Sequence, residues 1–215
     1  MSSDDTTRDR LIQAGIRLFG EHGYKPTTTR MLADEAQANI GSIAYYFDNK
    51  HGLYLAAARY IAGALRERLG IGAPGSVPDD REAAQATLED IVRRMVRTFA
   101  TDLECRHWLL MVMREQLHPS EAFDILQNQA FGVVQATLSS LIGRLTGRDA
   151  DDPVTTLETH TLVGQIVFFL IAREPLLRRL SLETFDTETL ATVEDVVVSH
   201  LRLYDIPDRQ SSMLE

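Results

Sequence analysis

The sequence of 215 residues contains one cysteine, Cys105, and no long hydrophobic run. A single cysteine cannot form an intramolecular disulfide or supply a multi-thiolate zinc site, which excludes a small disulfide-stabilised scaffold. The longest apolar run, residues 166–172, is far shorter than the roughly 20 residues that a membrane-spanning helix needs. Residues 1–10 are polar and precede no apolar signal core, so we expect no export signal. These absences favour a soluble protein of the reducing cytoplasm, with no membrane partner.

Positive charge is also scarce, since 22 Lys and Arg stand against 31 Asp and Glu, a formal net charge of −9. This balance argues at first against nucleic-acid binding, because phosphates attract Lys and Arg. The first 55 residues, however, carry 6 basic and 7 acidic side chains, so most of the acidic excess lies elsewhere. The charge therefore limits non-specific affinity without excluding a helix of this segment from a DNA groove.

Helical periodicity is present along almost the whole chain, and no segment shows the alternation of a strand over a useful length. The sequence predicts an all-α fold with helices over residues 5–20, 29–36, 40–46, 50–69, 79–100, 102–117, 120–145, 153–172 and 187–204. Residues 70–78 are rich in glycine and proline and predict a linker. Pro175 is expected to stop the helix that Pro153 begins.

The second and third predicted helices are short and are joined by a turn of three residues. This is the geometry that lets the second helix of the pair enter the major groove while the first braces it. Its small residues Gly41, Ser42 and Ala44 leave room for close approach to base edges. Ile43 and Phe47 are four residues apart and are expected to face the interior.

Polar and aromatic side chains surround the tip of this helix. Tyr45, Tyr46 and Lys50 could reach phosphates or bases, and Thr29 and Arg30 could bind the flanking backbone. Core packing is the alternative for the two tyrosines, because aromatics at helical spacing are usually buried. Capping of the preceding helix is the alternative for the threonine.

Three stretches carry a family resemblance: residues 10–24 (RLIQAGIRLFGEHGY), 27–36 (TTTRMLADEA) and 43–53 (IAYYFDNKHGL). They resemble, in order, the opening helix, the bracing helix and the end of the recognition helix of TetR transcriptional regulators. The resemblance implies a three-helix helix-turn-helix domain, followed by a helical domain that binds a small-molecule effector and forms a homodimer. By the same resemblance, contacts with double-stranded DNA fall on Thr29, Arg30, Ile40, Gly41, Ser42, Tyr45, Tyr46 and Lys50.

The sequence departs from the family pattern at two positions. Gln37 stands in the turn where the family usually has glycine, so we expect either a small backbone strain there or a slightly different turn. Ala44 stands where a tyrosine is common, so any contact made by that ring is missing. Both departures bear on the contact residues and not on the fold.

A fourth stretch, residues 109–123 (LLMVMREQLHPSEAF), is similar to the C-terminal domain of the CecR-like subgroup of TetR regulators. The resemblance does not identify an effector. We expect a DNA-binding domain over residues 1–50, an effector-binding and dimerisation domain over 51–205, and a flexible tail over 206–215.

The predicted helix over residues 102–117 is apolar on nearly every face, which is typical of a buried helix. His107 and Arg114 lie on one of these faces and require partners. An internal ion pair or a cap on a neighbouring helix would satisfy them, and anchoring of a ligand is the alternative. The candidate effector-binding residues are His107, Trp108, Met111, Arg114, Phe123 and Phe131, with core filling as the alternative for the apolar ones.

Metal and catalytic sites are not indicated. Glu104 with His107 and Glu115 with His118 have the spacing of metal ligands, but the pairs lie about 16 Å apart along one helix and cannot share an ion. Cys105 and His107 point to nearly opposite sides of that helix, so they cannot act as nucleophile and base. We expect no metal, no cofactor and no enzymatic activity.

Residues 162–171 and 193–201 contain more apolar surface than one side of a monomer can hide, unless both helices are fully internal. By the resemblance, they pair with their copies in a four-helix bundle. We therefore expect a repressor that binds a palindromic operator as a dimer and is released by an effector of unknown identity. A helical adaptor that has lost DNA binding is the alternative, supported by the acidic balance and Ala44, and an all-α enzyme is a third.

Overall fold

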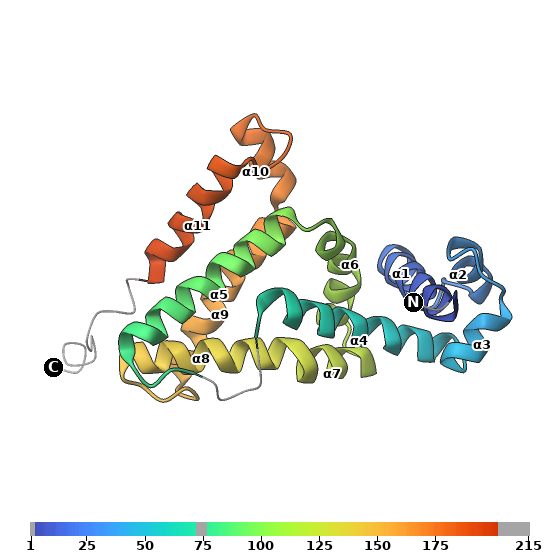
Figure 1. Ribbon diagram of the computed structural model, residues 1–215, viewed down its shortest axis with the longest axis horizontal. Helices are drawn as coiled ribbons and strands as arrows, with labels where there is room; N and C mark the ends of the chain where they lie inside the picture. The colour runs from blue at the N-terminus through green and yellow to red at the C-terminus, as the bar shows by residue number, and fades with distance from the viewer. Residues whose placement is uncertain (1–2, 72–76, 202–215) are drawn as a thin grey trace. The chain divides into compact units, whose positions relative to one another are not determined.

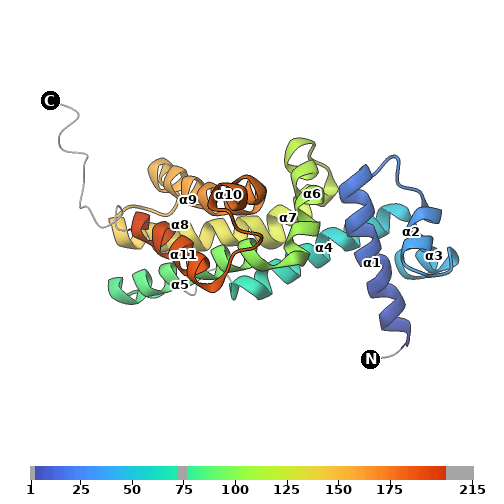
Figure 2. The same ribbon diagram turned by 90° about the horizontal axis from the view of Figure 1, so that it is seen from above.

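The computed structural model describes residues 3–71 and 77–201. Within these ranges every regular element is helical, which confirms the all-α fold (Figures 1 and 2). The elements are α1 (Ser3–His22), α2 (Thr29–Glu35), α3 (Gly41–Phe47), α4 (Lys50–Leu69), α5 (Arg81–Thr101), α6 (Leu103–Leu117), α7 (Glu121–Leu126), the π-helical turn η1 (Gln127–Phe131), α8 (Gly132–Thr146), α9 (Pro153–Ile171), α10 (Arg173–Leu180) and α11 (Thr187–Leu201). The predicted tail over 206–215 and most of the predicted linker lie outside the described residues.

The stop expected before Pro175 is confirmed for the helix that Pro153 begins, but a further helix, α10, was not predicted. The helix α9 does end at Ile171, but α10 begins two residues before Pro175. Pro175 is therefore the third residue of α10, where a backbone N–H has no partner within the helix, so its absence costs nothing there. The single helix expected over residues 120–145 is likewise divided, because the π turn η1 separates α7 from α8.

Contacts divide the chain into two compact units, residues 1–65 with 103–131 and residues 66–102 with 132–215. In the first unit, α1 packs against α2, α3 and α6. Its fully buried side chains include Leu11, Ile16, Phe19, Leu32, Ile43, Leu53 and Met111. Burial of each such side chain contributes about 2 kcal/mol, so the two short helices α2 and α3 are held by this core and not by their own propensity.

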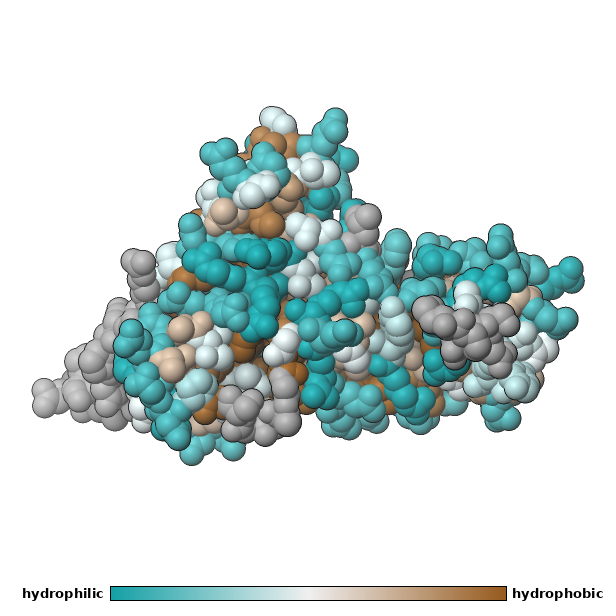
Figure 3. Space-filling model, viewed as in Figure 1, coloured by the Kyte–Doolittle hydropathy of each residue, from teal (hydrophilic) through white to brown (hydrophobic). Residues whose placement is uncertain are grey.

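In the second unit, α5 packs against α8, α9 and α11. Ion pairs add to the apolar contacts of α11: Arg97 donates to both carboxylate oxygens of Glu194 at 2.9 Å each, and Arg93 pairs with Asp195 at 2.8 Å. The Glu194 carboxylate is buried, and the charged donors compensate its desolvation. Figure 3 shows a largely hydrophilic face, on which apolar side chains gather over α10.

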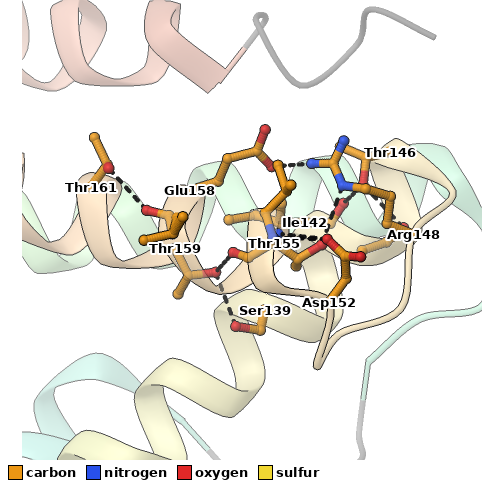
Figure 4. A network of polar contacts seen from close by, with 12 residues as sticks. Ser139, Ile142, Thr146, Arg148, Asp152, Thr155, Glu158, Thr159 and Thr161 are labelled. Atoms are coloured by element: carbon orange, nitrogen blue, oxygen red, sulfur yellow. Dashed lines mark hydrogen bonds and ion pairs between the residues drawn. The ribbon is translucent and has the colours of Figure 1, made fainter. Parts of the chain in front are cut away.

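The corner between α8 and α9 is held by a polar network (Figure 4). Arg148 donates from Nε to the buried Thr155 Oγ1 at 3.4 Å and also pairs with Glu158. Asp152 Oδ1 accepts the backbone N–H of Val154 at 2.8 Å, so this aspartate caps α9, and Pro153 begins the helix as expected. The network fixes the direction in which α9 leaves the corner.

The helix α9 is the one helix of the described part that is long and apolar enough to cross a membrane by length and composition, with a mean hydropathy of 1.4. Only 22% of the 18-residue window is buried. Its inner side includes the hydroxyl of Thr159, which lies 3.0 Å from that of Ser139 in α8. Its outer side carries large exposed apolar residues, among them Leu157, Phe168 and Ile171.

Candidate nucleic-acid interface

The two short helices α2 and α3 form the predicted helix-turn-helix. Leu32 and Ala33 of α2 are buried, as are Ile43 and Phe47 of α3, which confirms the expected inner face of the recognition helix. Both helices pack against α1. An ion pair between Arg17 of α1 and Glu35 of α2, at 2.8 Å, joins the bracing helix to this support.

A side-chain hydrogen bond holds the backbone at or just before the start of each helix. Thr28 Oγ1 accepts the backbone N–H of Met31 at 3.2 Å, and this bond caps α2. Asn39 Oδ1 accepts the N–H of Gly41 at 2.8 Å, while the Asn39 carbonyl accepts that of Ser42. Sequence reasoning missed Asn39, although asparagine just before a helix is a strong N-cap signal. The Asn39 bonds hold the backbone just before α3, at the end expected to approach DNA.

The structure places most of the predicted DNA contacts on the outer side of these helices. Arg30 of α2 and the tip residues Ile40 and Gly41 are exposed, and Tyr45 has 76% of its surface exposed. Thr29, Ser42 and Tyr46 are half-buried, and the rings of Tyr45 and Tyr46 meet edge to face at 4.8 Å. Core packing is therefore excluded for Tyr45, while Tyr46 supports its neighbour and retains partial exposure.

Lys50 occupies a different environment from the other candidates. Its Nζ donates to the carbonyls of Tyr24 and Thr27 at 3.0 and 2.8 Å and lies 4.3 Å from the centre of the Tyr24 ring. These bonds tie the start of α4 to the loop between α1 and α2. An ammonium group has three donors, so contact of Lys50 with a phosphate stays a prediction for its third N–H.

The expected backbone strain at Gln37 is confirmed, since its φ is +49°. Non-glycine residues adopt this left-handed conformation at a cost of about 1–2 kcal/mol. The Gln37 N–H donates to the carbonyl of Asp34 at 3.1 Å, and Arg10 Nη1 lies 3.5 Å from the Gln37 carbonyl. Backbone contacts thus hold the turn despite the strain.

Gln37→Gly is expected to raise the free energy of unfolding by about 1 kcal/mol, because glycine adopts positive φ without the steric cost. The backbone bonds of the turn remain available to the variant. Urea unfolding followed by circular dichroism measures the change, with Gln37→Ala as the control, which keeps the Cβ and is expected to remain within about 0.5 kcal/mol of the parent. Equal effects of the two substitutions would refute the strain.

The candidate effector residues differ in exposure. Trp108 and Met111 are buried, Phe123 and Phe131 are half-buried, and His107 is exposed. The Arg114 guanidinium donates from Nε and Nη2 to the carbonyls of Gly20 and Glu21, at 2.8 and 2.9 Å. This is the cap on a neighbouring helix that sequence reasoning offered as the alternative to a ligand anchor.

The expectation that α6 is buried on nearly every face is wrong. Leu110 and Leu117 are exposed, the latter at 70%, although both are large and apolar. The helix packs against α1 and α7, the Trp108 ring meets that of Tyr60 in α4 edge to face, and Cys105, Trp108 and Met111 are buried. Composition alone did not separate the covered face from the open one, because large apolar residues occur on both.

Comparison with known proteins identifies both halves of the chain. Residues 11–57 match the family of bacterial regulatory proteins of the tetR family, and residues 84–204 match the C-terminal domain of the HTH-type transcriptional dual regulator CecR. CecR of Shigella flexneri is 32% identical over 93% of this chain and 91% of its own length. The transcriptional repressor NicS of Pseudomonas putida is 22% identical over 77% of this chain and 76% of its own.

A solved structure of AibR in complex with isovaleryl coenzyme A and operator DNA has the same fold, with a TM-score of 0.62 at 13% identity. It covers 90% of this chain and 97% of AibR. The chain belongs to the TetR family of DNA-binding transcriptional regulators, which are not enzymes, and carries the C-terminal domain of the CecR subgroup.

Proposed function

We propose that the protein is a repressor of the cytoplasm that binds a palindromic operator as a homodimer and leaves it when a small-molecule effector binds. The observation that carries the proposal is the outward presentation of the α3 tip, with Gly41 and Tyr45 exposed above the buried Ile43 and Phe47. Small residues at the tip permit close approach to base edges in the major groove. The name of NicS as a repressor supports the sign of regulation.

The apolar side of α9 and α11 supports dimerisation. Leu157 and Phe168 are 66% and 65% exposed, and Val196 of α11 is also exposed, so the two helices are not fully internal. Large apolar side chains exposed on both helices support a protein interface there. A twofold dimer would present two copies of α3 about 34–36 Å apart, which matches one turn of DNA and a palindromic site.

The effector is proposed to contact the C-terminal family domain. AibR was solved with isovaleryl coenzyme A and operator DNA, which supports the coupling of an organic ligand to DNA binding on this fold. Trp108, Met111, Phe123 and Phe131 are the proposed apolar contacts, and His107 is a proposed polar one. Arg114 is not among the proposed effector contacts, because its guanidinium donates to carbonyls at the end of α1. A coupling of about 1–3 kcal/mol would change operator affinity 5–150-fold.

DNA binding through α2 and α3 is tested on operators selected from a random duplex library with the full-length protein. We expect Arg30→Ala to weaken binding uniformly and to lower the slope of log K against log salt by about one, because a phosphate contact is lost. Tyr45→Ala is expected to weaken binding with a relaxed preference at one base position. Fluorescence anisotropy at several salt concentrations measures both effects.

Arg59→Ala, on the exposed side of α4, is the matched control for the loss of one positive charge. It should leave the slope unchanged. If the library yields no enriched duplex at low salt, the adaptor alternative replaces the repressor.

A further inference from the structure

Two adjacent residues of α6, Arg114 and Glu115, bind two different helices of the first compact unit. Both belong to the stretch that resembles the CecR C-terminal domain. Their partners in α1 and α4 belong to the region that matches the N-terminal TetR family. The bonds therefore join the two family regions, within one compact unit.

Arg114 binds the carboxyl end of α1. Its two bonds reach the carbonyls of Gly20 and Glu21, which lie in the last turn of the helix and have no acceptor role inside it. A cation at this end also interacts favourably with the helix dipole. Gly23 follows with φ +84°, and a Cβ there would lie 3.3 Å from Arg114 Nη1, so glycine leaves space for the guanidinium.

Glu115 binds α4 and the start of α7. Its carboxylate is only 3% exposed, and it accepts a hydrogen bond from the Tyr54 hydroxyl. The other carboxylate oxygen accepts from Ser120 N and Ser120 Oγ, at 3.1 and 2.8 Å. Burial raises the pKa of Tyr54, and the bond to Glu115 raises it further, so the phenol remains a donor at all physiological pH values.

The backbones of α1 and α6 approach closely at the same place. A Cβ on Gly20 would lie 3.2 Å from Leu110 Cβ and 3.3 Å from the backbone N of Met111. The arginine bonds therefore act across a tightly packed crossing, where a small displacement of α6 would move α1. Because α1 supports α2 and α3, such a displacement would reach the recognition helix.

We propose that Arg114 and Glu115 are positioning residues for DNA recognition, which fix α1 and α4 around α3 without touching DNA. Arg114 holds the end of the helix that carries α2 and α3. Glu115 holds Tyr54 in the second turn of α4, the helix that begins directly after α3. This inference rests on the proposed operator binding and does not depend on the proposed effector.

The test measures operator affinity and its salt dependence for Arg114→Met, Glu115→Gln and Tyr54→Phe, on a duplex selected with the parent protein. Arg114→Met retains the aliphatic stem, and Arg59→Met on α4 is the matched control, since it removes the same charge from an exposed position. Thermal unfolding sets a working temperature at which every variant is folded. Hydrogen exchange at residues 19–23 reports the carboxyl end of α1.

We expect Arg114→Met and Glu115→Gln to weaken operator binding about tenfold or more, with an unchanged salt slope because no phosphate contact is lost. Arg114→Met should also speed exchange at the end of α1, and Tyr54→Phe should show a smaller loss of affinity. Arg59→Met should remain within about twofold of the parent. Affinities within twofold of the parent in folded variants would overturn the proposal, as would a reduced slope, whereas failure of the parent to bind any duplex would count against the function itself.

Discussion

Replacing Gly52 with alanine is expected to abolish specific operator binding and to lower the free energy of unfolding by about 3 kcal/mol. A Cβ at this position would lie 1.9 Å from the carbonyl oxygen of Phe47 and 3.1 Å from its carbonyl carbon. Both atoms are backbone, so no rotation of a side chain relieves the overlap. Phe47 is the last residue of α3, and the substitution therefore displaces the recognition helix from α4.

Gly63→Ala in the same helix is the matched control for this prediction. No described atom lies within 4 Å of the Cβ position at Gly63, so alanine there is expected to stabilise the protein by about 1 kcal/mol through helix propensity. Urea unfolding and anisotropy with the selected operator compare the two variants. Similar effects of the two substitutions on stability and operator binding would show that the overlap with the Phe47 backbone does not cause the loss.

Local patterns were sufficient to predict most helices. The bounds of α4 agree with the expectation at both ends, because its apolar residues keep a helical spacing and the chain breaks on either side. The inner residues Ile43 and Phe47 of α3 followed from their spacing of four. The helix α10 was missed because a proline both ends helices and occupies their first turn, and Pro175 was interpreted only as the end of a helix.

The long-range contacts of the site could not be predicted in the same way. Arg114 and Gly20 are 94 residues apart, and Tyr54 and Glu115 are 61 apart. Sequence reasoning predicted that Arg114 needed a partner, from the cost of burying charge, but could not choose the partner. Gly52 lies in the stretch that resembles the TetR family, but helical periodicity gave no reason for a glycine there, because a glycine within a helical pattern has no periodicity of its own.

Phe168→Glu is expected to convert the proposed dimer to a monomer and to weaken operator binding by about a hundredfold or more. Phe168 lies on the exposed side of α9 with Leu157, eleven residues earlier, so the two side chains share a face. A dimer would bury this face, and a carboxylate in its centre would lose hydration without a cationic partner. Each protomer would then bind only one half-site, and the affinity gained from linking two recognition helices would be lost.

Leu117→Glu is the matched control, because Leu117 is as exposed as Phe168 but lies on α6, outside the proposed dimer face. Sedimentation at several protein concentrations should give a dimer for the parent and for Leu117→Glu, and a monomer for Phe168→Glu. Circular dichroism should show the same helical content in the parent and both variants. Leu117 lies at the surface of the first unit and Phe168 at the surface of the second. A Phe168→Glu variant that remains dimeric would place the interface elsewhere, because a buried glutamate at the centre of an apolar contact cannot be neutral in its effect.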